Sequence, residues 1–222
     1  MPDNQHNQVN LNARPTEVGA PAFLWALVGL MALIELPLTL SDAGWIGSNE
    51  WRMNVFLLGA FWPPLVSDGI IPLYTGQKVL MFLTHAFLHG NFAHFAMNSV
   101  VLLALGKGIS SVYGASKTII LLALSAIVGA ATFWLLTSSS GPMIGASGAV
   151  FGLLGLWQAR DYRQRRALGQ SLQPVMSGIA GLIAINLVLY FALNGGIAWE
   201  AHLGGWLVGW ISAWTLASRS AK

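Results

Sequence analysis

Long apolar stretches, broken by glycine, proline and short charged segments, constrain the fold of this chain more than any other feature. Hydrophobic residues make up 55% of the sequence and charged residues 9%, whereas charged residues make up about 25% of a typical soluble domain. Apolar stretches of this length are typical of membrane-spanning helices. We therefore predict an all-α, polytopic membrane protein with six transmembrane helices, at residues 22–40, 92–105, 117–136, 148–160, 175–193 and 201–217.

The connection between the first two predicted spans, residues 41–91, is too polar and too rich in proline and glycine to be a further span. It still contains apolar clusters such as "VFLLGAFWPPL" and "VLMFLTHAFL", and its aromatic residues Trp45, Trp51, Trp62 and Tyr74 suit the interface between lipid and water. We predict a long first loop that is partly embedded in the membrane.

The positions of the basic residues predict the orientation of the chain. If both termini are cytoplasmic, every Lys and Arg except Arg52 and Lys78 falls on the cytoplasmic side, and "ARDYRQRRALGQ" is a clear cytoplasmic loop. The polar start of the chain lacks the apolar centre of a signal peptide. We expect a disordered cytoplasmic tail at residues 1–20, a membrane domain at 21–218 and a short cytoplasmic tail at 219–222.

The stretch "GPMIGASGAVFG" places the hydroxyl of Ser147 among glycines at the start of the fourth predicted span. Between Ser147 and the basic residues from Arg160 onward lie about 13 residues, which as a helix cover only about 20 Å of a hydrocarbon core ~30 Å thick. Because the basic end is held in the cytoplasm, the serine would lie below the outer surface. Non-helical backbone at that depth requires a protein interior or a water-filled cavity. We therefore predict a wet pocket with Ser147 at its floor.

The sixth predicted span opens with "EAHLGGWLVGW", which places His202 at a depth similar to that of Ser147. Glycines four residues apart let two membrane helices approach closely, and both spans carry such pairs, at Gly148 and Gly152 and at Gly205 and Gly209. We expect Gly145 to support this packing as well. Close packing would bring the imidazole to the hydroxyl, and a Ser–His pair is an activated nucleophile.

A third polar cluster lies near the outer end of the second predicted span. His94 and Asn98 are four residues apart and share one helix face. Their N–H groups, with the backbone N–H of Ser147, are suitable donors for the oxyanion that forms when serine attacks a carbonyl. His85 and His89 could instead form a metal-binding pair, but Ala86 stands where a His-Glu-x-x-His motif needs glutamate. No metal or other cofactor is expected.

Three motifs together resemble the rhomboid family of intramembrane serine proteases. They are "HGNFAHFAMN" before and within the second span, "GASG" around Ser147, and "AHLGGWLVG" around His202. The resemblance covers residues 22–217 and implies a Ser147–His202 dyad without an acid, with His94 and Asn98 stabilising the oxyanion. It also implies a structural role for His89 and a stacking role for Phe151. Some family members have a Trp-Arg pair where this chain has "VLMFLTH", so the first loop is expected to be anchored differently.

The function implied is an intramembrane serine endopeptidase that cleaves transmembrane segments near the outer membrane face. The expected partners are single-span membrane proteins and the lipid bilayer, with no role for nucleic acid, and the expected location is a bacterial inner membrane. Serines in glycine-rich membrane segments more often serve helix packing than catalysis. The alternative is therefore a non-catalytic membrane protein, either a transporter or a pseudoprotease that binds transmembrane helices. The sequence does not predict an oligomeric state.

Overall fold

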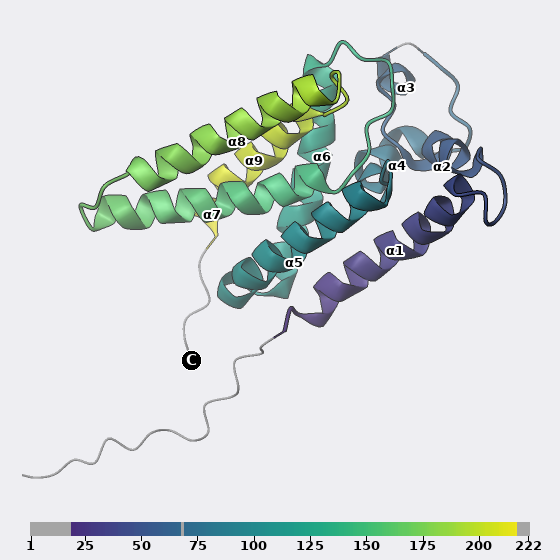
Figure 1. Cartoon of the computed structure of the whole chain (residues 1–222). Coiled ribbons are helices and arrows are strands. Elements are labelled where there is room, and N and C mark those ends of the chain that lie inside the picture. Colours follow the sequence, from purple (N-terminus) through teal and green to yellow (C-terminus); the bar gives the residue numbers. More distant parts are fainter. Residues whose placement is uncertain (1–18, 68, 217–222) are drawn as a thin grey trace, which may run out of the picture.

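The computed structural model describes residues 19–67 and 69–216, and in this part of the chain the long elements are all helices (Figure 1). They are α1 (Ala22–Asp42), α5 (Phe92–Tyr113), α6 (Ala115–Leu136), α7 (Ser147–Ala167), α8 (Gln173–Ala192) and α9 (Trp199–Thr215). Each of the six predicted spans corresponds to one of these helices. The predicted tails, at residues 1–20 and 219–222, lie almost wholly outside the described residues.

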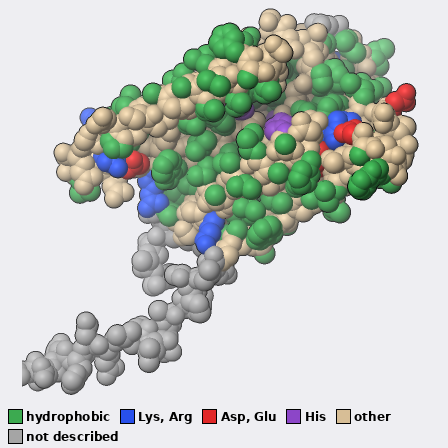
Figure 2. All heavy atoms as spheres, in the orientation of Figure 1, with side chains coloured by type: hydrophobic (Ala, Val, Ile, Leu, Met, Phe, Trp, Pro, Cys, Tyr) green, Lys and Arg blue, Asp and Glu red, His purple; other side chains and the backbone are tan. Residues whose placement is uncertain are grey.

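Four of the long helices, α1, α5, α6 and α8, are long and apolar enough to cross a membrane. The protein is therefore an integral membrane protein with an all-helical fold. Helix α9 is slightly shorter, with 17 residues, and α7 carries several arginines in its second half. Figure 2 shows a face dominated by hydrophobic side chains, with Lys and Arg gathered where α7 and α5 end.

Helix α7 is longer than the sequence analysis predicted. It begins at Ser147, as expected, but continues through the basic segment to Ala167, so its 21 residues span about 31 Å. The prediction of a short helix ending at Arg160 was wrong, because charged residues end the apolar segment without ending the helix. Arginine is a good helix former, and Arg165 forms an ion pair at 2.9 Å with Asp161, one turn earlier. Helix α5 likewise continues past residue 105.

About half of the first loop is helical. It contains α2 (Trp51–Gly59), α3 (Pro63–Ser67), α4 (Gln77–Thr84) and the short 3-10 helix η1 (His85–Phe87). The loop is joined to the rest of the protein by main-chain contacts: Phe61 forms an antiparallel β-bridge with Met143, close to the start of α7. Within the loop, the Thr84 hydroxyl donates to the carbonyl of Gly59 at 2.7 Å. The β-bridge attaches the loop to the segment that leads to Ser147.

The main hydrophobic core lies between α1, α5, α6 and α7. Its fully buried side chains include Leu24 on α1 and Leu153 and Leu156 on α7. A single residue, Gly114, connects α5 to α6, and its φ of +90° is a backbone conformation that favours glycine. Because this turn is so short, α5 and α6 are neighbours. Helices α1, α5, α6 and α7 therefore pack around one hydrophobic core.

Candidate active site

Ser147 is the first residue of α7, and the segment before it is held by the first loop. Gly145 donates its N–H to the carbonyl of His85 at 2.9 Å, and Met143 and Phe61 exchange two main-chain hydrogen bonds. Because Ser147 stands at a helix N-terminus, its own N–H has no acceptor within the helix. The residue therefore offers both a hydroxyl and a free backbone donor at one place.

The hydroxyl of Ser147 and the imidazole of His202 form a hydrogen bond. Ser147 Oγ lies 2.9 Å from His202 Nε2, although the two residues are far apart in the sequence. The ring of Phe151 stacks against the imidazole, with ring centroids 4.1 Å apart and an angle of 5° between the planes. His202 is 7% exposed. The ring is thus held in a fixed plane and pointed at the serine.

Glycines bring α7 and α9 into main-chain contact. A Cβ atom at Gly205 would overlap the carbonyl oxygen of Gly148, and one at Gly209 would overlap that of Gly152. At Gly148, a Cβ would lie 3.4 Å from the carbonyl oxygen of Ala201, next to His202. The close approach of the two helices therefore depends on bare backbone at these positions, and it sets the separation of Ser147 and His202.

Gly145 lies before α7 and contributes in a different way from the helix glycines. Its φ is +113°, and a Cβ there would lie 2.8 Å from His94 Cε1 and 3.7 Å from Ser147 Oγ. His94 and Ser147 therefore face the same small space. Asn98, one turn further along α5, is buried and donates one amide hydrogen to the carbonyl of His94 at 3.0 Å. An Asn side chain has two such hydrogens, so its second remains available.

His85 and His89 lie near this site, outside the long helices. His85 Nε2 is 3.4 Å from the carbonyl oxygen of Ala126, and burial lowers the pKa of His85 to about 4. The His89 ring packs edge-on against His94, with centroids 5.1 Å apart. Burial, followed by the nearby His94 and Arg52, lowers the pKa of His89 to about 3. Both rings are therefore neutral at physiological pH and support the loop.

A partly buried charge cluster, whose partners were not predicted from the sequence, anchors the first loop. Arg52, on α2, forms an ion pair at 2.9 Å with Glu35, which is 1% exposed in α1, and a second ion pair with Asp42. The same guanidinium donates to the carbonyl of His89 at 2.7 Å. Burial alone would lower the pKa of Arg52, but the bonds to Glu35 and Asp42 raise it overall. Arg52 contacts the loop before α5 from α2, whereas the Trp-Arg pair of some family members would lie at "VLMFLTH", which is mostly in α4.

Asn186, in the middle of α8, was also missed. Its Oδ1 lies 2.6 Å from Nδ1 of His202, on the opposite side of the ring from Ser147. The signal was present in the sequence, because an asparagine within the apolar run "GLIAINLVLY" is costly in a membrane and usually functional.

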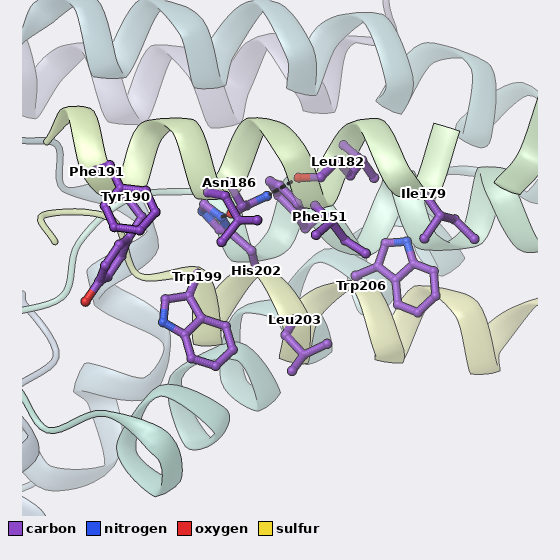
Figure 3. A pocket seen from close by; sticks show the side chains of 12 residues that line it. Phe151, Ile179, Leu182, Asn186, Tyr190, Phe191, Trp199, His202, Leu203 and Trp206 are labelled. Atoms are coloured by element: carbon purple, nitrogen blue, oxygen red, sulfur yellow. Dashed lines mark hydrogen bonds between the residues drawn. The ribbon is translucent and has the colours of Figure 1, made fainter. Parts of the chain in front are cut away.

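An apolar cavity of about 500 Å³ lies between α8 and α9, and His202 and Asn186 are on its wall (Figure 3). Side chains such as Leu182, Leu203 and Trp206 form most of the lining. Figure 2 shows histidine side chains at the surface near the start of α7. His202 and Asn186 therefore have an apolar cavity beside them.

Comparison with known proteins gives consistent matches. A family model described as the rhomboid domain matches residues 76–219. Rhomboid protease GluP of Bacillus subtilis is 27% identical over 94% of this chain and 38% of its own length, so the chain spans about two fifths of that protein. An uncharacterized protein of Mycobacterium tuberculosis is 30% identical over 94% of this chain and 80% of its own length. Rhomboid-like protease 1 of Toxoplasma gondii is 32% identical over 68% of this chain and 49% of its own length.

Proposed function

The chain belongs to the rhomboid family, and from that premise we propose that it is an intramembrane serine endopeptidase with Ser147 as nucleophile and His202 as general base. The observation that carries the proposal is the 2.9 Å hydrogen bond between Ser147 Oγ and His202 Nε2, in a ring fixed by Phe151. A serine hydroxyl is a weak nucleophile until an adjacent base takes its proton. Here the base is already in place.

The first chemical step forms an acyl-enzyme. Ser147 Oγ attacks the carbonyl carbon of the scissile peptide bond, and its proton passes to His202 Nε2. The carbonyl oxygen becomes an oxyanion, which accepts hydrogen bonds from the Ser147 N–H, His94 and Asn98. His94 supports this role because its ring faces the space next to Ser147 Oγ. His202 then gives its proton to the leaving nitrogen, and the C–N bond breaks.

The second step is hydrolysis. A water molecule loses a proton to His202 and attacks the acyl carbon, and the ester bond to Ser147 breaks with return of a proton to Oγ. This chemistry uses no metal or cofactor, and the donors and the base all come from the chain. The water reaches the site from the outer face of the membrane.

The substrates we propose are single-span transmembrane proteins, cut near the outer membrane face. A transmembrane helix would enter sideways between α5 and α8 and unwind locally, because a peptide carbonyl inside an intact helix is inaccessible. Small or helix-breaking residues in the substrate lower the cost of this unwinding, since lipid offers no partners for freed backbone groups.

We propose that α7 and α9 also cross the membrane, giving six spans with both termini cytoplasmic. The arginines at the end of α7 support this orientation, and the site at its other end then lies toward the outer face. A bacterial inner membrane is the proposed location.

Labelling with a fluorophosphonate probe tests the nucleophile directly. The purified protein in lipid bilayers should be labelled at Ser147, and Ser147→Ala should abolish labelling, while Ser139→Ala, in the exposed segment before α7, should leave it intact. Labelling that persists in Ser147→Ala would exclude Ser147 as nucleophile. Incubation with a single-span membrane protein and mass spectrometry of the products would then locate the cut, whereas a transporter would show flux that survives Ser147→Ala.

A further inference from the structure

We propose that Asn186 is a positioning residue that completes a Ser147–His202–Asn186 triad by fixing the proton of His202 on Nδ1. The inference rests on the proposed function above and deepens it. Asn186 comes from α8, the helix on the far side of the cavity from α9 (Figure 3). Its amide oxygen is the third group of the site, in addition to the Ser147 hydroxyl and the His202 imidazole.

The orientation of the Asn186 amide follows from its two hydrogen bonds. Nδ2 lies 2.8 Å from the carbonyl oxygen of Leu182, one turn earlier in α8. A carbonyl oxygen only accepts hydrogen bonds, so the NH₂ group must face it. The amide oxygen is therefore the atom directed at His202, at 2.6 Å from Nδ1.

The protonation of the imidazole follows in turn. Asn186 Oδ1 can only accept, so His202 Nδ1 must carry a hydrogen and donate it. In the neutral ring, the lone pair then lies on Nε2, which is 2.9 Å from Ser147 Oγ. This tautomer is the one in which His202 can remove the serine proton. With the hydrogen on Nε2 instead, the ring would donate to the serine and could not act as its base.

The surroundings of the ring give Nδ1 few other partners. The cavity wall next to it is formed mainly by apolar side chains, including Ile179 and Ile183, and Phe151 covers one ring face. When His202 takes the serine proton, the ring becomes positively charged, and the Nδ1–H bond to the amide oxygen strengthens because its donor is now ionised. Asn186 thus acts twice, by selecting the tautomer and by stabilising the protonated ring.

The rate of fluorophosphonate labelling of the full chain in lipid bilayers tests this role. Asn186→Leu keeps the approximate volume but removes the acceptor, and we expect labelling to slow by about 3- to 10-fold, as for one neutral hydrogen bond. Asn186→Asp keeps an acceptor and should restore most of the rate. Ile185→Ala, at a neighbouring lipid-facing position, is the matched control and should label like the wild type. Equal rates for Asn186→Leu and the wild type, or equal losses in Asn186→Leu and Asn186→Asp, would overturn the proposal.

Nitrogen-15 NMR of histidine-labelled protein gives a readout that packing alone would not change. In the wild type, the His202 resonances should show a protonated Nδ1 and an unprotonated Nε2, and Asn186→Leu should shift the ring toward a mixture of tautomers. An unprotonated Nδ1 in the wild type would overturn the proposal even if the Asn186 variants fail to fold. If the wild type is not labelled at Ser147, the proposed protease function fails, but the tautomer of His202 still decides the role of Asn186.

Discussion

Helix α9 carries His202 and helix α8 contacts it through Asn186, but the two helices are held in the protein in different ways. Helix α9 buries Gly204, Gly205 and Gly209 against the backbone of its neighbours. In α8, only 6% of the apolar segment is buried, and a Cβ added at Gly181 would meet open space. Lipid is as apolar as leucine, so helices in a membrane associate through close packing and polar contacts rather than through the hydrophobic effect. The comparison shows that α9 belongs to a packed block, whereas α8 is attached loosely, with Asn186 as one of its polar contacts.

The largest expected effect is the loss of labelling when leucine replaces a glycine of α9, compared with the same replacement in α8. Gly205→Leu would force a side chain into the carbonyl of Gly148, and because backbone cannot move aside locally, the helices must separate. We expect the rate of fluorophosphonate labelling to fall by at least about 100-fold, since misplacing a reacting group by 1 Å can cost that much. Gly181→Leu makes the same change in α8, where there is open space. Its labelling rate should lie within about 2-fold of the wild-type rate.

Similar losses in the two glycine variants would show that α8 is packed as tightly as α9. Normal labelling of Gly205→Leu would refute the dependence of the site on main-chain contact.

Helix α1 gives a second test of the comparison. Like α8 it is largely unburied, with 22% of its apolar segment buried, but an ion pair between its Glu35 and Arg52 anchors it. Arg52→Met would leave Glu35 buried without its positively charged partner, and removing one partner of a buried ion pair typically costs about 3–5 kcal/mol. We expect a clear fall in thermal stability, measured in detergent micelles. The double variant Arg52→Met, Glu35→Met should recover much of it, because both charges are then gone. A single variant as stable as the wild type would mean that the ion pair does not anchor the loop.

Leucine truncations measure the same contrast in packing energy. Leu153 on α7 is fully buried, whereas Leu187 on α8 is 54% exposed. Leu153→Ala should lower the free energy of unfolding by about 2–5 kcal/mol through loss of contacts and creation of a cavity, and Leu187→Ala should change it by less than about 0.5 kcal/mol. Reversible unfolding in mixed micelles can measure both. Equal costs would contradict the description of α8 as loosely held.

The smallest expected effect concerns the segment before α7, where close contact occurs without a helix. Gly145→Ala would place a methyl group against the His94 ring at a φ of +113°, and strain of this kind costs about 1–3 kcal/mol. We expect slower labelling with a modest loss of stability. Gly141→Ala, where a Cβ would meet a serine hydroxyl at 3.4 Å, is the control and should behave like the wild type. If Gly145→Ala labels normally, His94 does not need its present position.

The sequence predicted the parts of this protein that local pattern determines. Apolar length located the long helices, and the glycine spacing around Ser147 and His202 predicted which two helices touch, because main-chain contact requires the absence of side chains. It did not predict the end of α7, since a change from apolar to charged residues marks a change of solvent and not the end of a helix.

Contacts across the fold were beyond local pattern. The pairing of Arg52 with Glu35 depends on how the first loop folds back against α1. Asn186 was missed because a helix that is apolar all round gives no sign of which face points inward. In both cases the residue type was informative, since an ionisable or amide side chain in an apolar segment needs a partner, but the partner is fixed only by tertiary structure.

The main-chain contact between α7 and α9 has a consequence for how the site responds to its surroundings. Side chains can change rotamer when a membrane thickens, thins or changes composition, but a carbonyl resting on an α-carbon has no such freedom. If α7 and α9 tilt to match the bilayer, Ser147 and His202 should move together as one body. The distance between them should then not depend on the lipid, whereas α8 should shift relative to both helices.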